Sequence, residues 1–599
     1  MISKRGEPIA APALRDMNDL ARHRGPDDSG YHFGVGFAFG HRRLSILDLS
    51  QAGHQPMSYQ GRYTLTYNGE VYNYLELRIE LESLGHRFAT RTDTEVILAA
   101  WSEWGAKALT RFNGMWAFAL HDAAEEKIYL ARDRFGVKPL CYCDTEREFC
   151  FASEIKQLLP RQPRTHVNQA RLIDYLLTHV ENHTGESMFR GIMVVPGGCY
   201  LEFDLKERAY KTTRYYDLSR QISMIDASGK SSVARFEELL QDSISLRLRS
   251  DVTVGTCLSG GIDSSVVSVM ASQQYTPGSG RMFKAIHARG MDAEVDESAY
   301  AVRVAKHAGL DLSVVRPEQR DFEEQVDEVV YTQEEPFGSP SMFMGWHVFR
   351  KARELGCKVM LNGQGGDEVL LGYERYIAPF LSPFRPLDSY SMASTLSRNS
   401  GIPLWQVLSY GPYFRSMRFR RLLLRRKSVL RREITLEHDL RYLKASCESF
   451  RSVREMQLYE ILGMQLPHLL RYEDRNSMRH SIETRLPFLD YRLVEYCLSL
   501  PGEEKLGNGW TKLILRRVAE KHLPSDVAWR GRKLGFEAPT RSWFAGHGSA
   551  MRKAVGESRI LAEVADSKRL VGEYETFSNK VKWSLFNVAV WERVFNVAP

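Results

Sequence analysis

The chain has 599 residues and a formal net charge of +7, with 43% hydrophobic and 26% charged residues. This length allows about two to four domains, and the composition excludes a disordered or fibrous protein. No stretch is apolar for long enough to span a bilayer, and the N-terminus lacks a basic-then-apolar signal pattern, so we expect a cytoplasmic protein. The eight cysteines are scattered without a repeated C-x₂-C pair, which favours reduced structural thiols over a metal site.

The chain up to about residue 205 is rich in predicted strands. Alternating apolar and polar residues predict strands at 61–73, 111–122 and 127–143. Helical spacing interrupts this pattern at 74–85 and 94–105. The mixture indicates an α+β sandwich of stacked sheets flanked by helices.

A different pattern begins after a polar segment, residues 206–232, which lacks periodicity and is the expected linker. From residue 233 to 599, short apolar strands alternate with long helices. This alternation is typical of a parallel sheet with helices on both faces. Ligands of such sheets bind beyond the carboxyl ends of the strands.

The segment CLSGGIDSSVV, residues 257–267, follows a short β-branched run and leads into a small-residue helix. A strand, a Gly-rich turn and a helix start present backbone N–H groups and the positive end of a helix dipole to one point. Ser259, Ser264 and Ser265 add hydroxyl donors, and Asp263 can hold a Mg²⁺ that bridges phosphate oxygens. The segment predicts a phosphate site of a kind other than the Walker loop, because no Gly-Lys-Ser/Thr follows. The alternative is a Gly/Ser turn that caps a helix.

A second loop, within KVMLNGQGGDEVLLGYERY at 358–376, has the same character. An apolar strand breaks into N-G-Q-G-G-D-E, whose glycines permit close backbone approach to a ligand. Asp367 and Glu368 offer oxygen ligands for Mg²⁺. A solvent-exposed glycine turn is the alternative for this loop alone. Together the two loops suit a nucleoside triphosphate held with a metal ion.

The positive charge is concentrated in one stretch, RSMRFRRLLLRRKSVLRR, residues 415–432, which contains no acidic residue. A basic helix with interleaved leucines could meet nucleic acid or an anionic membrane face. A solvated helical face in an insertion is the favoured interpretation. We therefore expect no nucleic-acid partner.

Nearly the whole chain resembles the glutamine-dependent asparagine synthetase family. The N-terminal motifs that carry the resemblance are RHRGPDDSG, HRRLSILD, YNGEVYNY, RTDTEVIL and ARDRFGVKPL. The C-terminal motifs are SGGIDSS, GQGGDE, GYERY, LLRYEDRNSMRHSIETRLPFLD, WTKLILR and RKLGFEAP. The resemblance implies an N-terminal-nucleophile amidohydrolase sandwich, the glutamine amidotransferase type 2 domain, over residues 1–205. It implies an α/β pyrophosphate-loop synthetase domain over residues 233–599.

The resemblance also implies a reaction. The first domain would release ammonia from glutamine, and the second would use ATP and Mg²⁺ to adenylate a carboxylate. Ammonia arriving through an internal tunnel would then displace AMP. The simplest acceptor is L-aspartate, which would give asparagine, AMP and pyrophosphate. A homodimer is left open.

The family's functional residues can be carried over where this sequence matches. For glutamine, Asp93 would pair with the α-ammonium and Arg43 with the α-carboxylate, while Asn68 and the Gly69 N–H would form the oxyanion hole. Lys512 would offset charge on the phosphates. The implied glutamine-binding residues are Arg43, Asn68, Gly69, Glu70 and Asp93. The implied nucleotide contacts are Leu258, Ile286, Asn362 and Gly363, with Ser259, Gly260, Gly261, Asp263, Ser264 and Ser265 on the pyrophosphate and Asp263 and Asp367 on the metal.

The first departure from the family concerns the nucleophile. The family begins Met-Cys-Gly-Ile and uses the cysteine, freed at the N-terminus, as nucleophile. This chain begins MISKRGEP, and its first cysteine is Cys141. A start chosen too late in the gene is the favoured explanation, and an ammonia-only enzyme with a degenerate glutaminase domain is the alternative. We expect the chain as written to make amide from ammonium without hydrolysing glutamine.

The second departure is Gln364, the catalytic position where asparagine-forming members usually carry Glu. An amide cannot act as a general base, so either another group accepts the proton or the acceptor differs. Relatives in surface-polysaccharide clusters resemble this chain in carrying Gln, which implies a uronic acid or another carboxylate as the alternative acceptor. A further alternative is a non-catalytic partner of a membrane or polysaccharide assembly that docks through residues 415–432.

Overall fold

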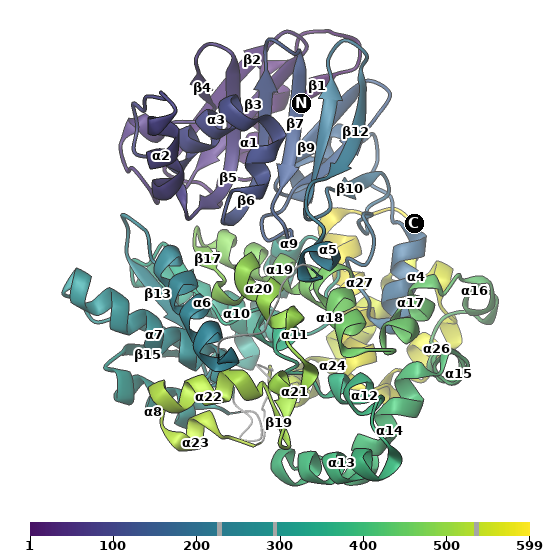
Figure 1. Cartoon of the computed structure of the whole chain (residues 1–599). Helices are drawn as coiled ribbons and strands as arrows, with labels where there is room; N and C mark the ends of the chain where they lie inside the picture. The colour runs from purple at the N-terminus through teal and green to yellow at the C-terminus, as the bar shows by residue number, and fades with distance from the viewer. Residues whose placement is uncertain (224–230, 291–295, 532–537) are drawn as a thin grey trace.

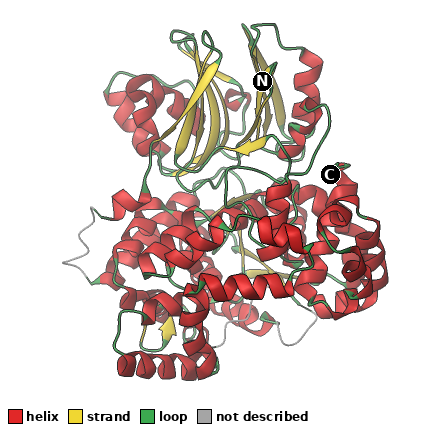
Figure 2. Cartoon of the chain, turned by 90° about the vertical axis from the view of Figure 1, so that its right-hand side faces the viewer, coloured by secondary structure: helices red, strands yellow, loops and turns green. Residues whose placement is uncertain are grey.

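The computed structural model describes residues 1–223, 231–290, 296–531 and 538–599. A strand-rich N-terminal part lies over a larger helical part formed by the rest of the chain (Figure 1). Seen from the side, the upper part has two layers of strands with helices outside them, whereas helices surround the strands of the lower part (Figure 2). The expected order, an α+β sandwich followed by an α/β part, is confirmed.

Within the described residues, the N-terminal part contains two six-stranded antiparallel sheets. The first sheet has the order β10-β8-β9-β1-β3-β2 and consists of β1 (Ile2–Ser3), β2 (Asp28–Gly34), β3 (Phe37–Arg43), β8 (Cys141–Asp144), β9 (Glu148–Ala152) and β10 (Ile192–Val194). The second has the order β12-β11-β7-β6-β5-β4 and consists of β4 (Met57–Tyr59), β5 (Tyr63–Val71), β6 (Gly114–Asp122), β7 (Lys127–Arg132), β11 (Cys199–Asp204) and β12 (Ala209–Arg214).

The two sheets stack because each has one apolar face. Residues two apart on a strand lie on the same face, so Phe37 and Phe39 of β3 both meet Ala117 and Ala119 of β6 in one core cluster. Helix α3 (Asp93–Trp104) covers the outer face of the second sheet, together with α2 (Tyr74–Ser83). Helix α1 (Ala11–Asp19) packs outside the first sheet, against β3.

The predicted strand at 127–143 is wrong as a single element. The chain forms β7, turns through 133–140 and enters β8 in the other sheet. Gly136, at φ +70°, and Pro139 fall in this turn, and both residues favour turns over strand interiors. The predicted strands at 61–73 and 111–122 and both predicted helices are confirmed as β5, β6, α2 and α3.

The described strands of the C-terminal part form a parallel sheet in the order β15-β14-β13-β16-β17. The strands are β13 (Val254–Cys257), β14 (Lys284–Ala288), β15 (Asp311–Val315), β16 (Val359–Leu361) and β17 (Glu483–Arg485). The order reverses between β13 and β16. In open parallel sheets, this reversal point is where ligands bind beyond the strand ends.

Strand β16 shows why both faces of this sheet are covered. Val359 and Leu361 belong to a core cluster with residues of α6 (Ser232–Arg247) and α7 (Ile262–Ser279). Met360, between them, belongs to the cluster on the other face with residues of α10 (Ser341–Glu354). Because neighbouring side chains point to opposite faces, an uninterrupted apolar strand requires a helical layer on each side.

The boundaries between the parts differ from the prediction. Residues 209–214, expected in the linker, form β12, whose six residues all pair with β11. As an edge strand with mostly exposed side chains, β12 lacks the apolar alternation by which buried strands are recognised. Helix α4 (Gln169–Thr178) lies against the C-terminal part, where Tyr175 Oη donates to the Phe337 carbonyl at 2.9 Å. Residues 224–230 of the expected linker lie outside the described residues.

A helical insertion separates β16 from β17. It includes α12 (Ile377–Leu381), α13 (Pro386–Ser400), α14 (Leu404–Arg415), α15 (Met417–Lys427), α17 (Arg441–Ser449) and α18 (Val453–Leu462). Helix α19 (Gln465–Arg479) follows and leads into β17. In the described parts of the chain, every helix is too short or too polar to cross a bilayer. The eight cysteines are free thiols.

Candidate functional site

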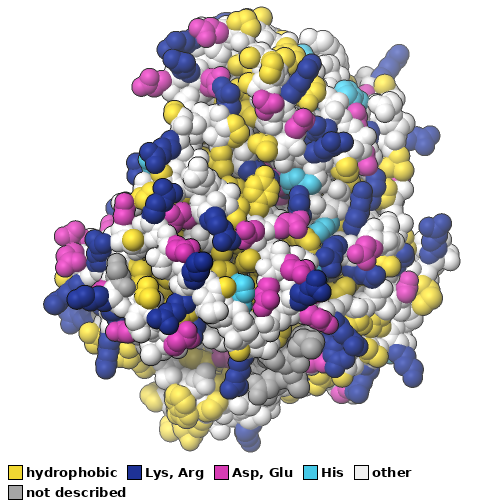
Figure 3. Space-filling model, turned by 180° about the vertical axis from the view of Figure 1, so that it is seen from behind, with side chains coloured by type: hydrophobic (Ala, Val, Ile, Leu, Met, Phe, Trp, Pro, Cys, Tyr) yellow, Lys and Arg dark blue, Asp and Glu magenta, His cyan; other side chains and the backbone are white. Residues whose placement is uncertain are grey.

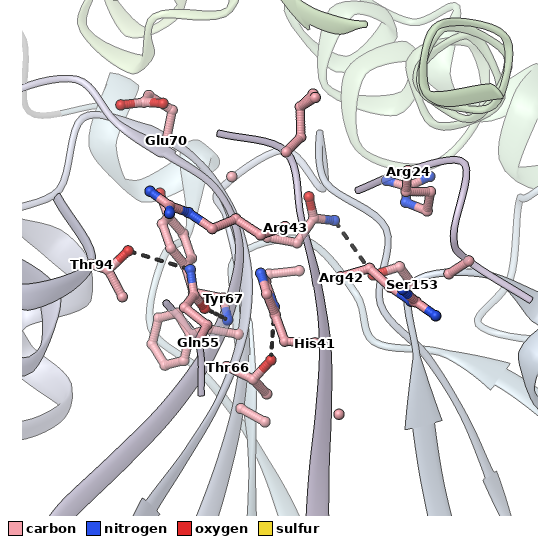
Figure 4. Close-up of a pocket in the computed structure, with 18 of the residues that line it drawn as sticks. Arg24, His41, Arg42, Arg43, Gln55, Thr66, Tyr67, Glu70, Thr94 and Ser153 are labelled. Carbon is pink, nitrogen blue, oxygen red and sulfur yellow. Dashed lines mark hydrogen bonds between the residues drawn. The ribbon is translucent and has the colours of Figure 1, made fainter. Parts of the chain in front are cut away.

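A first cavity of about 170 Å³ opens between the two stacked sheets, at the end that faces the C-terminal part (Figure 4). The structure brings together here all of the residues expected to bind glutamine. They come from three elements: the end of β3, the end of β5 and the first turn of α3. The five residues are Arg43, Asn68, Gly69, Glu70 and Asp93.

Arg43 is oriented by backbone carbonyls. Its guanidinium donates to the carbonyl of Ser50 at 2.8 Å and to that of Leu47 at 3.3 Å, and it also contacts the carbonyl of Asp48. Burial lowers the pKa of this guanidinium, and nearby carboxylates, Asp28 first among them, partly offset that effect. Neutral carbonyls fix the side chain without cancelling its charge, so Arg43 can still attract a carboxylate.

Asp93 lies in the first turn of α3, which Thr92 caps. Its Oδ2 accepts from Tyr67 Oη at 2.7 Å and from the Val71 N–H at 2.9 Å. Burial raises the pKa of the Asp93 carboxyl to about 6, against the lowering effect of these two hydrogen bonds. Both donors are neutral, so an ammonium group would find an anionic partner here.

Gly69 and Asn68 lie where β5 runs along the cavity. Gly69 has φ +146°, and a Cβ there would lie 2.1 Å from the Met115 carbonyl oxygen of β6, so only glycine fits. Asn68 Nδ2 reaches Ser153 Oγ at 3.5 Å. The two residues are placed as neighbours in the cavity wall, as an oxyanion hole would require.

Glu70 lines the cavity and also contacts the parallel sheet. Its Oε2 forms an ion pair at 3.0 Å with Arg485 of β17, and Arg485 also pairs with Glu483 at 2.9 Å. In Figure 4, Glu70 lies at the upper edge of the cavity, above Arg43 and Tyr67. The Glu70 carboxylate thus links the cavity to the parallel sheet, because the tertiary fold supplies a cation that the sequence motif does not reveal.

The first cysteine of the chain does not reach this cavity. Cys141 is buried on β8, and burial raises the pKa of its thiol well above the usual range. Among the described residues that line the first cavity, none is a cysteine.

A second cavity, of about 350 Å³, opens where the parallel sheet reverses its strand order. Both glycine-rich loops reach it, one following β13 and the other following β16. The expected residues that line it are Leu258, Ser259, Gly261, Asp263, Ser264, Ile286, Asn362, Gly363, Gln364, Asp367 and Lys512.

Two residues expected on the pyrophosphate do not line this cavity. Ser265 is fully buried inside α7, which turns its side chain away from the loop. Gly260 backs onto a neighbouring helix, where a Cβ would lie 2.9 Å from the Glu297 carbonyl oxygen. The Ser265 hydroxyl is therefore not placed to contact a phosphate in this cavity, whereas a contact from the Gly260 backbone stays a prediction. The alternative role of Glu368 as a metal ligand also fails, because its side chain is buried against Tyr373, whose hydroxyl donates to it at 2.7 Å.

The loop after β13 is built as an anion cradle. Ser259 Oγ lies 2.9 Å from Ser264 Oγ and accepts from the Gly261 N–H at 3.2 Å. Gly261 is the N-cap of α7, so the first turn of this helix directs its N–H groups towards the cavity. A helix N-terminus with added hydroxyls is a favourable site for phosphate oxygens.

Asp263 and Asp367 converge on one cation. Lys512 Nζ contacts Asp263 Oδ2 and lies 2.8 Å from Asp367 Oδ1. The ammonium is buried, and the two carboxylates raise its pKa against the opposing effect of burial. The carboxylates come from the two different loops, so the tertiary fold makes this pair.

These carboxylates suit Mg²⁺. Magnesium bound with a nucleotide takes one or two carboxylates and completes its octahedron with phosphate oxygens and water. Within the described ranges, no group of three or more His, Cys, Asp or Glu side chains could hold a metal by itself. Asp263 and Asp367 would therefore hold the ion together with the triphosphate.

Glu473 of α19 is a lining residue that sequence reasoning missed. Its Oε1 accepts from Asn362 Nδ2 at 2.7 Å, and burial raises the pKa of its carboxyl to about 7. The other acidic lining residues have cationic partners: Asp263 and Asp367 contact Lys512, and Glu297 contacts Arg530. The motif LLRYEDRNSMRH contains Glu473, but only the packing of α19 against the second loop indicates its role.

Helix α19 forms a wall of both cavities. Glu473 and Asn476 line the second cavity, and Met478 lines the first. Glu473 and Met478 are five residues apart, which corresponds to about 7.5 Å along a helix axis. Between them, Asp474 forms a bidentate ion pair with Arg24 of the N-terminal part, at 2.7 and 3.0 Å. The same helix therefore contributes to the walls of both cavities, with the buried Arg24–Asp474 pair between them.

Comparison with known proteins covers both parts of the chain. Residues 235–593 match the family model described as asparagine synthase, and residues 3–216 match the one described as glutamine amidotransferase domain. A Mycobacterium tuberculosis protein, whose assignment as a glutamine-hydrolysing asparagine synthetase is provisional, is 32% identical over 98% of this chain and 94% of its own. Glutamine-hydrolysing asparagine synthetase 1 of Bacillus subtilis is 30% identical over 88% of this chain and 84% of its own.

Among solved structures, glutamine phosphoribosylpyrophosphate amidotransferase from B. subtilis covers 59% of this chain and 79% of its own. The identity is 17% and the TM-score is 0.26, which is too low to carry an argument.

Proposed function

Because the chain belongs to the glutamine-hydrolysing asparagine synthetase family, we propose that this carbon–nitrogen ligase amidates L-aspartate, giving asparagine, AMP and pyrophosphate. The family's two domains together carry out glutamine-dependent amidation. The observation that carries the proposal is the convergence of Asp263 and Asp367 on Lys512, between two glycine-rich loops at the point where the sheet reverses.

The first half-reaction joins the carboxylate to AMP. A carboxylate oxygen of the acceptor attacks the α-phosphorus of ATP, and the bond to pyrophosphate breaks. The N-terminus of α7 and the hydroxyls of Ser259 and Ser264 stabilise the phosphate oxygens, and Lys512 offsets the charge that develops on the leaving pyrophosphate. Mg²⁺ bound by Asp263 and Asp367 would supply further positive charge to the phosphates.

The second half-reaction replaces AMP by ammonia. Ammonia attacks the acyl carbon, the nitrogen loses a proton, and the bond to AMP breaks. We assign Glu473 as the general base that accepts this proton. The amide of Gln364 cannot accept it, and the other acidic lining residues are paired with cations. Gln364 lines the same cavity and is assigned to positioning the acceptor by hydrogen bonds.

We propose that the first cavity binds glutamine, the family's source of ammonia. The described residues that line it include no cysteine, so the chain as written would take its ammonia from ammonium. Arg43 would hold the α-carboxylate and Asp93 the α-ammonium, while Asn68 and the Gly69 N–H stabilise the oxyanion. Glu70 is assigned to fixing the cavity against β17, since its charge is paired with Arg485. The cytoplasmic location and a homodimer stay predictions.

One observation favours a second acceptor class. Gln364 lines the cavity at the position where asparagine-forming members usually carry Glu, so a uronic acid or another carboxylate is the competing acceptor. The experiment measures AMP and pyrophosphate release from ATP with ammonium supplied directly, across aspartate, other amino acids and uronic acids. Aspartate-dependent release of both products supports the proposal. Release with a uronic acid and none with aspartate would replace the acceptor, and no release with any carboxylate would refute the activity.

A further inference from the structure

The helical insertion presents an unusual surface that runs from α13, at the end of the molecule farthest from the N-terminal sheets, through α14 to α15 at the side (Figure 1). Large apolar side chains on three consecutive helices are exposed there, with Leu387 at 84%, Trp405 at 72% and Leu422 at 64% of their full area. We name this surface the α13–α15 face. Its exposed apolar residues are Leu387, Tyr390, Trp405, Leu408, Tyr413, Phe419 and Leu422.

Helical spacing and one ring contact align neighbouring side chains of this surface. On α14, Trp405 and Leu408 are three residues apart and therefore share a side of the helix. Tyr413 then meets Phe419 of α15 edge to face, with ring centroids 6.1 Å apart, which joins the two helices. Figure 3 shows hydrophobic side chains gathered at this lower end of the molecule.

The segment that carries this surface is strongly basic. Residues 386–427 contain eight basic side chains and one acidic one, a surplus as large as the formal net charge of the whole chain, +7. Arg418, Arg421 and Arg426 of α15 are exposed, and among the described residues none of them has an acidic partner. Phe419 and Leu422 lie between these arginines along the helix.

We propose that the α13–α15 face docks on an anionic lipid bilayer. Exposed Trp, Phe and Leu side chains next to unpaired arginines are the combination by which peripheral helices enter the headgroup layer of such membranes. Charge complementarity favours this occupant over a second copy of the chain, whose own face would present the same positive charge. Nucleic acid would explain the arginines but not the exposed Leu387 and Trp405.

Docking would bring the synthetase cavity close to the membrane. The last turn of α13 lies against Gly531, where a Cβ would come within 2.2 Å of the Asn399 carbonyl oxygen, and Gly531 lines the second cavity. From Leu387 at the start of α13 to Asn399 is 12 residues, or about 18 Å along the helix axis. An enzyme docked in this way would carry out amide synthesis next to the bilayer surface.

The experiment is co-sedimentation of the full chain with vesicles of phosphatidylcholine alone and with phosphatidylglycerol added. We expect binding to the anionic vesicles only, weakened by salt. Exchanging Arg418, Arg421 and Arg426 together for Gln should lower binding about 100-fold, since each basic residue near an anionic surface contributes about fivefold. A separate Leu387→Ser and Trp405→Ser double variant should also lose binding.

The controls are Arg320→Gln, a charged side chain 82% exposed on α9 (Gln319–Gln333), and Val35→Ser, an apolar one 87% exposed between β2 and β3. Both should bind as the wild type does. All variants should keep carboxylate-dependent exchange of pyrophosphate into ATP in solution, which shows that they are folded.

Equal binding to neutral and anionic vesicles, or none to either, would overturn the proposal. Loss of self-association in the Leu387→Ser and Trp405→Ser variant, without vesicle binding by the wild type, would instead make this face a contact between copies.

Discussion

Glu70 and Arg485 form an ion pair at 3.0 Å in the interior, between strand β5 of the sandwich and strand β17 of the parallel sheet. Arg485 is fully buried and also pairs with Glu483. The pair joins a residue of the first cavity to the sheet that carries the second. Removing the guanidinium would strand the buried Glu70 carboxylate, whereas Glu483 would keep Lys138 at 3.6 Å.

The first prediction concerns the stability of this junction. Arg485→Met should lower the free energy of unfolding by about 3–5 kcal/mol, the usual cost of stranding a buried charge. Glu70→Gln should cost less, because Arg485 keeps Glu483. Urea unfolding followed by circular dichroism measures both, with Arg320→Met on the surface as control. An unfolding midpoint for Arg485→Met equal to that of the control would show that the junction carries no stability.

The second prediction concerns the two acidic residues at Lys512. Asp263→Asn and Asp367→Asn should each abolish carboxylate-dependent exchange of pyrophosphate into ATP. Each variant loses a carboxylate ligand of the metal ion, so the negative charge of the phosphates is no longer offset. The matched control is Asp311→Asn, an exposed aspartate of β15. The melting temperatures of both variants should equal that of the wild type, which shows that the exchange activity is not lost through unfolding. Exchange at the wild-type rate in either variant would place the metal elsewhere.

The third prediction separates the half-reactions at Glu473. Glu473→Gln should keep pyrophosphate exchange but slow ammonia-dependent amide formation about 10²–10⁴-fold, the usual contribution of a positioned base. In the wild type, amide formation should rise with pH through about 7, because the base acts only when ionised and its pKa is raised to about 7. Equal loss of both half-reactions would make Glu473 a structural residue. Amide formation by Glu473→Gln at the wild-type rate would exclude Glu473 as the base.

The fourth prediction follows from the pKa of the same carboxyl. Its folded-state pKa of about 7 exceeds the ordinary 4.5, so its contribution to stability is complete below pH 4.5 and is lost as pH rises through 7. Glu473→Gln removes the ionisable carboxyl, and with it this loss of stability at high pH. Relative to the wild type, the variant should gain about 3 kcal/mol between pH 4 and pH 8. Urea titrations at both pH values test this, and a pH-independent difference would contradict it.

The fifth prediction concerns Gln364. If the acceptor is aspartate, Gln364→Glu should keep or raise ammonia-dependent asparagine formation, because a carboxylate near the attacking amine can accept its proton. If the acceptor is a sugar acid, the wild type should release little AMP with aspartate, and Gln364→Glu should not rescue it. AMP release measured over a panel of carboxylates distinguishes these two cases. Strong aspartate turnover that collapses in Gln364→Glu would contradict the expectation that a carboxylate at this position serves the aspartate reaction.

Local patterns in the sequence determined the two folds and most of the second cavity. The alternation around Asn68 predicted β5, and the apolar runs before Ser259 and Asn362 predicted parallel strands that end in glycine-rich loops. Such features are local, because strand periodicity and the need for glycine in tight turns act over a few neighbouring residues. The edge strand β12 was missed, because one exposed face and one free edge leave no apolar alternation to detect.

Only the tertiary structure decided which charges meet. Glu70 meets Arg485 across 415 positions of the chain, and Lys512 meets Asp263 across 249. Glu473 became a candidate base only because α19 packs it against Asn362, and Ser265 lost its expected role because α7 buries it. Ion pairs and burial act over a few ångströms in space, and the packing of helices and sheets, not the spacing along the chain, sets those distances.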